Sequence, residues 1–447
     1  MSAHPIDYRY GSEEMRNIFE EEARMRKMLE VEIALINALN KMGKVPDSAV
    51  KEAAEKASKV ELSRVREIEK EVHHDVMAMV LSLSEQCDPD TAKYIHLSAT
   101  SYDIVDSALA LQMKEALGVL IKKAKQALAE AIQIAKENDT VVMIGRTHGQ
   151  HATPITFGFK FANYCQKLGE DIDRLEYDSK QHVRGKFSGA VGNYSVQKVF
   201  EVEGLEEIVM DNLNLKPAEV STQVVGRENI ARIVCDIAIL AATLEQIAKE
   251  VRNLQRTEIG EVREGFGKKQ VGSSAMPQKQ NPINAENICS NARVVRSAVY
   301  PALENIALEH ERDLTNSASE RTILPTVFLL TDDMLERTIK MLKNLEIFPD
   351  KMKENINITQ GRIMAENVVS GLVRKGVPRQ KAHEMLRKAS LESMKKRKHL
   401  KEILLEQKDI MEYLTPEELE ELMDPDKYVG LAVEKTHRIT KKWEKLK

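Results

Sequence analysis

One run of apolar residues limits the possible folds of this chain more than any other feature. Between residues 230 and 254 apolar side chains recur about every 3.4 residues, close to the 3.5-residue repeat of helices packed at shallow angles in a bundle. At 1.5 Å per residue this run makes a helix roughly 36 Å long. Similar patterns occupy residues 157–181, 283–311 and 324–345. The sequence therefore predicts a bundle of long helices.

Residues that break helices are scarce in this chain. The 447 residues include 20 glycines and 13 prolines, about 7% of the total against a typical value near 12%. Ser12 and Gly43 mark the ends of one predicted helix of about thirty residues. Residues 185–196 form the only plausible β-hairpin. We therefore predict an all-α fold of three helical domains: an N-terminal domain at 1–112, a central long-helix bundle with a mobile loop at 113–358, and a C-terminal helical cap at 359–447.

The charge balance and the cysteine spacing argue against several classes of protein. Lys and Arg number 66 and Asp and Glu 70, so the chain lacks the positive excess typical of nucleic-acid-binding proteins. We expect neither a signal peptide nor a membrane span, because no apolar run is long enough. The cysteines lack the spacing of zinc or disulfide motifs, and we expect reduced, buried thiols. The sequence thus favours a soluble cytoplasmic protein with no nucleic-acid or membrane partner.

A histidine-containing segment, Gly145–His151, is the first candidate for chemistry. Its glycines rule out a continuous helix and present His148 on a loop, where a histidine can act as a general acid or base. A structural, hydrogen-bonded histidine is the alternative. A metal site that combines His148 and His151 with residues 73–75 also stays open.

A glycine-rich segment, residues 259–282, is the second candidate. It holds four of the chain's 20 glycines within 13 residues. It also carries serines, an asparagine and lysines, one of which is Lys268. This composition suits a lid that closes cationic and hydroxyl groups over an anionic substrate, although a disordered surface loop is the alternative. Met276 favours the lid, because an apolar residue there implies a packed conformation. Neither a P-loop nor a dinucleotide fingerprint fits, since Phe266 and Gln270 stand at required positions.

A pair of arginines, Arg312 and Arg321, is the third candidate. They are nine residues apart, so a continuous helix would place them on opposite sides. A break in the helix would let both converge on one site. The alternative is a solvated face with ordinary salt bridges.

The segment Gly272–Pro282 closely resembles the G-S-S-x-M-P-x-K-x-N-P signature of the fumarase/aspartase superfamily of lyases. Within that superfamily, Thr147–Gln150 is similar to the adenylosuccinate lyase family, whereas other members usually have Leu after the histidine. Further segments resemble the same family, so the resemblance covers essentially the whole chain: residues 9–10, 73–76, 95–101, 311–313, 319–321, 424–425 and 428.

This resemblance implies a fold, an assembly and a reaction. The long helices of four subunits are expected to join in one bundle, a homotetramer whose active sites draw on three subunits each. The implied activity is that of a carbon–nitrogen lyase in purine biosynthesis, with no metal or organic cofactor. It would release fumarate by β-elimination from two small molecules, adenylosuccinate, giving AMP, and the succinylated aminoimidazole carboxamide ribotide.

The resemblance also assigns roles to individual residues. His148 is the expected acid and Ser273 the expected base. A serine is a weak base at neutral pH, so its alkoxide must be stabilised by loop N–H groups and nearby cations. The expected substrate-binding residues are Arg9, Tyr10, His73, His74, Asp75, His96, Thr100, Ser101, Gln223, Ser274, Lys279, Gln280, Asn281, Asn287, Arg312, Ser317, Ala318, Ser319, Glu320 and Arg321.

Several positions depart from the family pattern. Ser98 stands where Gly is usual, Gln278 and Gln280 replace His and Arg, and Asn316 replaces His. Loss of an arginine near an anion site could change the balance between the two substrates. A sister enzyme such as argininosuccinate lyase therefore stays open as an alternative. A non-catalytic helical scaffold of the same lineage also stays open, although Ser273 and His148 are both intact.

Overall fold

A computed structural model of the chain describes residues 5–267 and 269–446, and it confirms the predicted all-α class. Lys268, one of the cations assigned to the predicted lid, lies outside these residues. Within the described ranges, no helix is long and apolar enough to cross a membrane. The chain groups into two compact units. Unit 1 comprises the residues up to Ala124, Asp171–Leu244 and Ser290–Glu336; unit 2 comprises Lys125–Glu170, Glu245–Cys289 and the residues from Arg337.

Long helices form the framework, as the apolar repeat predicted. The residues of the run at 230–254 lie in one helix, α11, and Ile233, Ile237 and Leu240 on it are fully buried. The pattern at 283–311 is interrupted, because α12 ends at Ser297 and a separate short helix follows. The long helices are α7 (Ser101–Glu137), α8 (Phe157–Gln181), α11 (Arg227–Leu254), α12 (Ile283–Ser297) and α14 (Thr315–Lys343).

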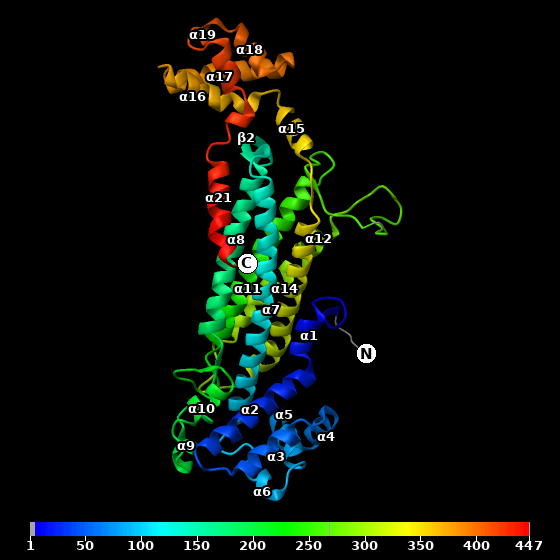
Figure 1. Cartoon of the computed structure of the whole chain (residues 1–447), viewed down its shortest axis with the longest axis vertical. Helices are drawn as coiled ribbons and strands as arrows, with labels where there is room; N and C mark the ends of the chain where they lie inside the picture. Colours follow the sequence, from blue (N-terminus) through cyan, green and yellow to red (C-terminus); the bar gives the residue numbers. More distant parts are fainter. Residues whose placement is uncertain (1–4, 268, 447) are drawn as a thin grey trace. The chain divides into compact units, whose positions relative to one another are not determined.

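Unit 1 begins with two helices where one was predicted. Ser12 accepts a hydrogen bond from the Met15 N–H and starts α1, but Glu20 has an extended backbone and separates α1 from α2. Helices α2 to α6 lie together in Figure 1. The remaining elements of unit 1 are η1 (Pro5–Asp7), α1 (Glu13–Phe19), α2 (Glu21–Lys41), α3 (Asp47–Ala57), α4 (Leu62–Val72), α5 (Asp75–Ser84), α6 (Pro89–Ala92), β3 (Arg184–Gly185), α9 (Ser195–Phe200), α10 (Leu205–Asn212), β4 (Lys216–Pro217) and α13 (Val299–Glu304).

The hairpin of this fold lies elsewhere than predicted. β3 pairs with the parallel strand β4, and the residues after Gly185 bond to α7, so the hairpin prediction at 185–196 is wrong. The antiparallel hairpin is β1 (Val142–Thr147) with β2 (Gln150–Thr156), and its register shifts between Ile144 and Arg146. We had interpreted the glycines of that segment only as helix breakers.

Unit 2 has a C-terminal core of short helices. Leu372, Leu386, Leu404 and Leu419 are buried in it, and Ile144 of the hairpin joins the same cluster. Helices α16 to α19 lie side by side in Figure 1. The elements are β5 (Val262–Arg263), β6 (Glu346–Ile347), α15 (Pro349–Asn357), η2 (Arg362–Met364), α16 (Ala365–Arg374), α17 (Arg379–Lys396), α18 (Leu400–Glu406), α19 (Lys408–Met411), α20 (Pro416–Leu422), η3 (Pro425–Lys427), α21 (Ala432–Trp443) and η4 (Glu444–Leu446).

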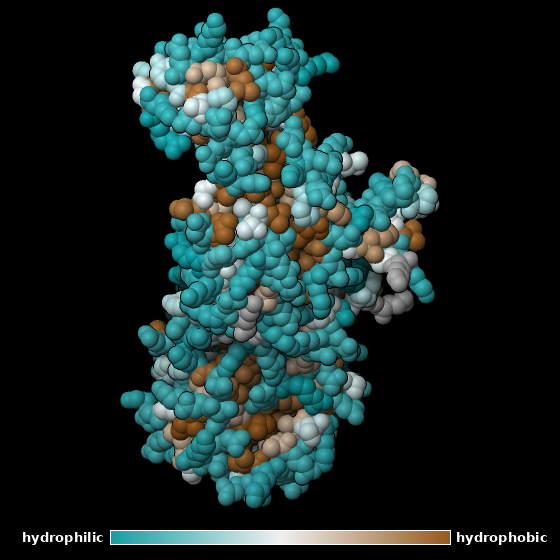
Figure 2. Space-filling view, turned by 45° about the horizontal axis from the view of Figure 1, so that its top comes forward, coloured by the Kyte–Doolittle hydropathy of each residue, from teal (hydrophilic) through white to brown (hydrophobic). Residues whose placement is uncertain are grey.

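The surface of the chain is mixed. Figure 2 shows a face on which hydrophobic patches interrupt a mainly hydrophilic surface. The exposed large hydrophobic residues include Ile239 on α11, Tyr300 and Leu303 on α13, and Leu314 just before α14. All four cysteines are free. The prediction that they are buried is confirmed for Cys165 and Cys289, whereas Cys87 and Cys235 are half-buried.

Candidate active site

In unit 1, His74 is oriented by the helix that it begins. Its Nδ1 accepts a hydrogen bond from the Met77 backbone N–H at 3.3 Å, which caps α5. A neutral imidazole whose Nδ1 is an acceptor carries its proton on Nε2. That nitrogen lies 3.3 Å from the Ser101 hydroxyl. Two predicted binding residues from different segments therefore meet, and the imidazole N–H faces the start of α7.

Asp75 holds an arginine that was predicted to bind an anion. Its Oδ2 accepts hydrogen bonds from Arg24 at 3.0 Å and from Arg321 at 3.4 Å. Burial acts to raise the pKa of the Asp75 carboxyl, but Arg24 and Arg321 together bring this pKa below its usual value. The carboxylate therefore stays ionised at neutral pH and pairs with the Arg321 guanidinium, whose side chain is 60% exposed. No sequence signal distinguished Arg24 from the other charged residues of its helix.

His96 is held by a buried carboxylate. Its Nδ1 lies 2.6 Å from Glu32 Oε1, and its backbone N–H donates to Glu32 Oε2 at 3.2 Å. The Glu32 side chain has no exposed surface. Burial acts to lower the pKa of the His96 imidazole, but the hydrogen bond and the charge of Glu32 raise it above its ordinary value.

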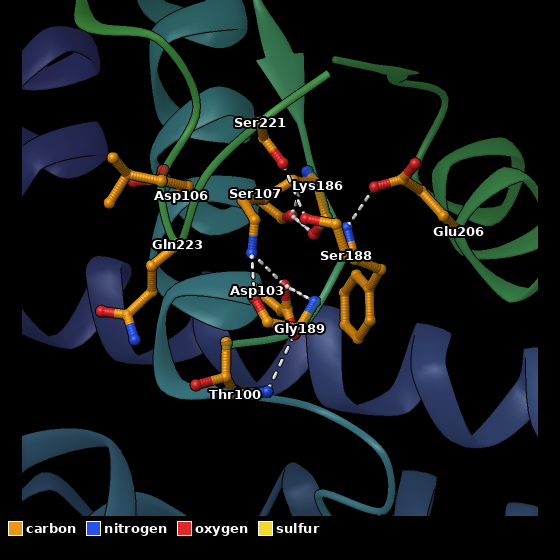
Figure 3. Close-up of polar contacts among 12 residues, drawn as sticks. Thr100, Asp103, Asp106, Ser107, Lys186, Ser188, Gly189, Glu206, Ser221 and Gln223 are labelled. Atoms are coloured by element: carbon orange, nitrogen blue, oxygen red, sulfur yellow. Dashed lines mark hydrogen bonds and ion pairs between the residues drawn. The ribbon is translucent and has the colours of Figure 1, made fainter. Parts of the chain in front are cut away.

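One buried carboxylate fixes the start of α7, as Figure 3 shows. Asp103 accepts hydrogen bonds from the Thr100 N–H at 2.8 Å and the Gly189 N–H at 3.3 Å, and it pairs with the Lys186 ammonium. Neither Asp103 nor Lys186 has any exposed side-chain surface. The predicted binding residue Thr100 is thus bound to the segment 186–189.

The segment 186–189 is itself hydrogen-bonded on its other sides. The Phe187 N–H donates to Glu206 Oε1 at 2.6 Å, and the hydroxyls of Ser188 and Ser221 lie 2.7 Å apart. The Glu206 and Ser221 contacts come from segments far along the chain (Figure 3). This side of the site is therefore preformed within unit 1.

A second buried carboxylate, Asp106, lies one turn further along α7. It accepts two hydrogen bonds of 2.8 Å from the Arg227 guanidinium and one of 2.8 Å from the Val225 N–H. Arg227 also donates to Glu320 at 3.0 Å. These contacts join α7 and α11 to α14 immediately before Arg321. The sequence analysis missed Asp103, Asp106, Lys186 and Arg227; two acids three residues apart within an apolar run were the available signal.

Arg312 and Arg321 do not share one continuous helix, which is the condition under which both could converge on one site. Arg312 precedes α14, which begins at Thr315, whereas Arg321 lies within it. Arg312 donates to Gln223 Oε1 at 2.8 Å, and its guanidinium stacks 3.6 Å from the centre of the Tyr102 ring. A cavity of about 230 Å³ in unit 1 is lined by Tyr102 and by residues of α14, including Arg321. Ser317 and Glu320 also line it.

The predicted binding residues at the start of the chain are attached to α14. Arg16 donates to the Tyr10 carbonyl oxygen at 3.1 Å, and the Ser12 N–H donates to Asp332 at 2.7 Å. The Arg9 side chain is exposed. Arg9 is therefore an exposed cation on an anchored segment.

In unit 2, His148 stands at the tip of the β1–β2 hairpin. Thr147 pairs with Gln150, and His148 and Gly149 between them have φ of 53° and 73°. Two successive residues with positive φ are typical of a two-residue type I′ hairpin turn. The turn presents an exposed imidazole, which agrees with the predicted loop position.

The Ser273 hydroxyl lies at the head of a small turn in the glycine-rich loop. Its Oγ accepts hydrogen bonds from the Ala275 N–H at 3.3 Å and the Met276 N–H at 3.1 Å. Two backbone donors directed at one oxygen stabilise negative charge on it. Met276 itself is 44% exposed within this chain, so its side chain does not provide the packing that we expected of the loop.

The two sides of this loop approach each other closely. Asn281 donates to the Gly272 carbonyl oxygen at 2.9 Å. A Cβ added at Gly272 would overlap the carbonyl oxygen of Lys279. Lys279, Gln280 and Asn281 also line a second cavity of about 810 Å³ in unit 2. Its other cations, Lys249 and Arg252 of α11 and Arg256 just after it, were not predicted from the sequence.

Other predicted residues make only local contacts or none that define a site. Asn287 Nδ2 donates within its own helix to the Ile283 carbonyl oxygen, and the Ala318 carbonyl oxygen accepts from Thr322. His73 ends α4 in a left-handed conformation. Ser274 is exposed and Ser319 half-buried. Among residues 5–267 and 269–446, no group of three or more His, Cys, Asp or Glu side chains could hold a metal ion.

Known proteins that resemble this chain identify its class. The family described as Lyase matches residues 7–297. A fumarate lyase from Mesorhizobium sp. BNC1 superposes with a TM-score of 0.89 at 26% identity, covering 99% of each chain. The 3-carboxy-cis,cis-muconate lactonizing enzyme from Pseudomonas putida gives a TM-score of 0.90 at 26% identity, again covering 99% of each chain. The fold and the signature loop therefore define a member of this group of lyases.

More similar relatives narrow the family. The adenylosuccinate lyase of Pyrococcus abyssi is 47% identical, over 97% of this chain and 96% of its own. That of Methanothermobacter thermautotrophicus is 46% identical, over 99% of this chain and 100% of its own. The family described as Adenylosuccinate lyase C-terminus matches residues 361–439. The chain belongs to the adenylosuccinate lyase family.

Proposed function

We propose that this chain is an enzyme that eliminates fumarate from adenylosuccinate, giving AMP, and from the succinylated aminoimidazole carboxamide ribotide of purine biosynthesis. Membership of the adenylosuccinate lyase family supports this function over nearly the full length of the chain. The sister activity on argininosuccinate has no comparable support, because both the C-terminal family match and these relatives are adenylosuccinate lyases.

The observation that carries the proposal is the environment of Ser273. In the elimination, a base removes a proton from the carbon beside a carboxylate, and an acid protonates the nitrogen as the C–N bond breaks. Backbone N–H groups of Ala275 and Met276 already donate to the Ser273 oxygen. They lower the cost of the alkoxide, which can then accept the substrate proton. His148, exposed at its hairpin turn, supplies the proton to the leaving nitrogen.

The substrate carries carboxylates and a phosphate, and cationic side chains of the protein can neutralise this negative charge. Arg321 pairs with Asp75, and Arg312 is held by both Gln223 and the Tyr102 ring. Guanidinium groups held in this way bind planar or tetrahedral oxyanions with little further loss of side-chain entropy. We assign these arginines, with Arg9 and Lys279, to the anionic groups of the substrate.

The reaction as proposed needs no metal or organic cofactor, since Ser273 and His148 supply both proton transfers. We expect full activity in excess EDTA. Reproducible inactivation that one added divalent metal reverses would instead support the metal interpretation of the histidines.

We also propose that the enzyme is a homotetramer of three-domain subunits with boundaries at residues 112 and 358. The C-terminal family match at 361–439 and the exposed hydrophobic residues Ile239, Tyr300 and Leu303 support this organisation. A cytoplasmic location stays a prediction.

Shared active sites can be tested by complementation. Inactive His148→Ala and Ser273→Ala proteins, unfolded and reassembled together, should regain activity if each site takes these residues from different subunits. In a statistical mixture about one quarter of sites would then be intact. Verified hybrid tetramers that stay inactive would show that both residues come from one chain.

The direct test of the function is an assay of the purified protein with adenylosuccinate and argininosuccinate side by side, following fumarate release. We expect turnover of adenylosuccinate only. Turnover of argininosuccinate alone would establish the sister activity, and no turnover of either substrate would favour a non-catalytic scaffold.

A further inference from the structure

The most informative contact outside the residues assigned so far lies between the His148 hairpin and the base of the Ser273 loop. Arg146, two residues before His148, donates from Nη1 to Glu261 Oε2 at 2.8 Å and from Nη2 to Glu261 Oε1 at 2.6 Å. This is the paired geometry in which a guanidinium is both most strongly bound and most precisely oriented. The Arg146 side chain is 17% exposed and the Glu261 side chain 0%.

Glu261 is fixed by more than its arginine. Its Oε1 also accepts from Asn355 Nδ2 at 2.8 Å, and Asn355 donates to the Ile259 carbonyl oxygen at 2.8 Å. The Glu261 N–H bonds to the Leu254 carbonyl oxygen, and its own carbonyl oxygen accepts from the Phe348 N–H. The carboxylate therefore has a set position before the loop begins.

Both ends of the loop are tied together just beyond this point. The Glu264 carboxylate accepts from the N–H groups of Asn284 and Ala285 at 3.2 and 2.7 Å, across the mouth of the loop. Gln255 bonds to the Glu264 N–H and to the Gln280 carbonyl oxygen, both at 3.0 Å. The segment that carries Ser273 thus departs from a rigid stem that begins at Glu261.

The hairpin is equally anchored on its other side. Ile144 is fully buried in the core of the C-terminal helices, and the register of the ladder shifts between Ile144 and Arg146. His151 lies opposite Arg146 in the ladder. Burial and the Arg146 charge lower the pKa of His151, with Glu261 opposing them, so His151 is neutral at neutral pH. It therefore does not replace Arg146 as the cation for Glu261.

We propose that Arg146 and Glu261 are positioning residues for the elimination. Within one chain they fix the His148 hairpin to the stem of the Ser273 loop, and so place each catalytic residue in the site that it serves, also where the two serve different sites of the tetramer. This inference rests on the proposed function, because it takes the roles of His148 and Ser273 from it. Stability alone explains the pair poorly, since buried ion pairs can often be replaced by apolar residues without loss of stability. Displacing a catalytic group by about 1 Å, in contrast, can reduce a rate about 100-fold.

The test separates positioning from stability with an apolar double variant. Arg146→Met/Glu261→Leu removes both charges together, whereas Glu261→Gln alone leaves the buried Arg146 uncompensated. We expect the double variant to melt close to wild type but to have a kcat on adenylosuccinate at least about tenfold lower. Lys160→Met/Glu250→Met is the matched control, because that partly buried pair joins α8 to α11 at 2.6 Å outside the hairpin and the loop. The control should keep its kcat.

A kinetic isotope effect gives a readout that loss of folded protein cannot change. With adenylosuccinate deuterated at the carbon that loses its proton, a misplaced base makes C–H cleavage more rate-limiting, so the isotope effect on kcat should rise. Arg146→Lys keeps the charge but loses the paired geometry, and it should fall between wild type and the double variant. If the double variant does not fold, Arg146→Lys and Glu261→Gln decide the question by the same isotope effect.

Two outcomes would overturn the proposal. One is a folded double variant with a kcat within twofold of wild type and an unchanged isotope effect. The other is a loss of rate in the single variants that the fraction of folded protein explains completely. If wild type itself fails to turn over adenylosuccinate, the proposed function fails first, so the two failures are distinguishable.

Discussion

The predicted substrate-binding region of unit 1 and the catalytic loop of unit 2 are built in opposite ways. In unit 1 the carboxylates of Asp103 and Asp106 are buried, and each bonds to two or more groups of a chain segment distant in sequence. In unit 2, Ser274 to Gln280 are exposed, and the loop is held mainly at its ends. In the proposed reaction, the first region would bind charged groups of the substrate that do not change. The second carries a base that must meet the substrate and let products leave.

This difference teaches that stability and catalysis should respond separately to mutation. A buried network of charged groups forms when the chain folds. Changes in it should therefore first reduce the free energy of unfolding. An exposed loop contributes little to stability, so changes in it should first reduce rate. The predictions below test this separation, beginning with the largest effect.

The sharpest case is the removal of either catalytic side chain. Ser273→Ala and His148→Ala should each lower kcat by at least about 10² to 10⁴, because each removes one half of the proton transfer. Both side chains lie outside the buried core, so melting temperature and assembly state should stay unchanged. Steady-state kinetics with adenylosuccinate and thermal unfolding check both points. A rate within tenfold of wild type would remove that residue from its assigned role.

The opposite case is a broken buried pair in unit 1. Lys186→Met leaves the Asp103 carboxylate without its cation in a site with no exposed surface. We expect a loss of about 3–5 kcal/mol in the free energy of unfolding, measured by chemical denaturation. The exposed pair Lys59–Glu55 is the control, and Lys59→Met should cost less than about 1 kcal/mol. Equal losses in the two variants would contradict the contrast between the regions.

The sequence predicted the exposed region better than the buried one. The signature loop is a local string, and Ser273, Lys279 and Asn281 could be found from it alone. The long helices were also predictable, since the apolar repeat of α11 follows from helix geometry. Asp103 and Lys186, however, meet only in the folded chain, 83 residues apart, and their spacing carries no signal. The break at Glu20 was missed for a similar reason, because the residues on both sides favour helix.

A substitution at Gly272 in the loop should change the catalytic rate without changing stability. An added Cβ at Gly272 would overlap the Lys279 carbonyl oxygen, so Gly272→Ala must open the loop beside Ser273. We expect kcat to fall about tenfold with no change in unfolding free energy. Gly267→Ala in the same loop is the matched control, since its Cβ would meet only the Gln270 side chain at 3.7 Å. Similar rates for the two variants would mean that the reaction does not need the close approach of Gly272 to Lys279.

The His96–Glu32 pair predicts a dependence of stability on pH in unit 1. Glu32 raises the pKa of His96 in the folded protein above its ordinary value of 6.5. The stability from this group is therefore fully present below pH 6.5 and is lost as pH rises through the raised pKa. Unfolding free energies measured across this range should fall more steeply in wild type than in Glu32→Gln. Parallel curves would show that the pair does not bind the proton more tightly on folding.

The smallest expected effect concerns a strained residue in the otherwise well-bonded region. Ser98 has φ of 66°, a left-handed conformation that glycine adopts more easily, and its buried Oγ has no hydrogen-bond partner within residues 5–267 and 269–446. Ser98→Gly removes both the backbone strain and the unpaired hydroxyl, although glycine adds entropy to the unfolded chain. We expect a net gain of about 0.5–1 kcal/mol in unfolding free energy, measured by denaturation. Asn214→Gly is the control, because Asn214 has φ of 50° but asparagine tolerates that conformation, so its gain should be smaller. A loss of stability in Ser98→Gly would mean that the serine side chain contributes more to this region than its strain costs.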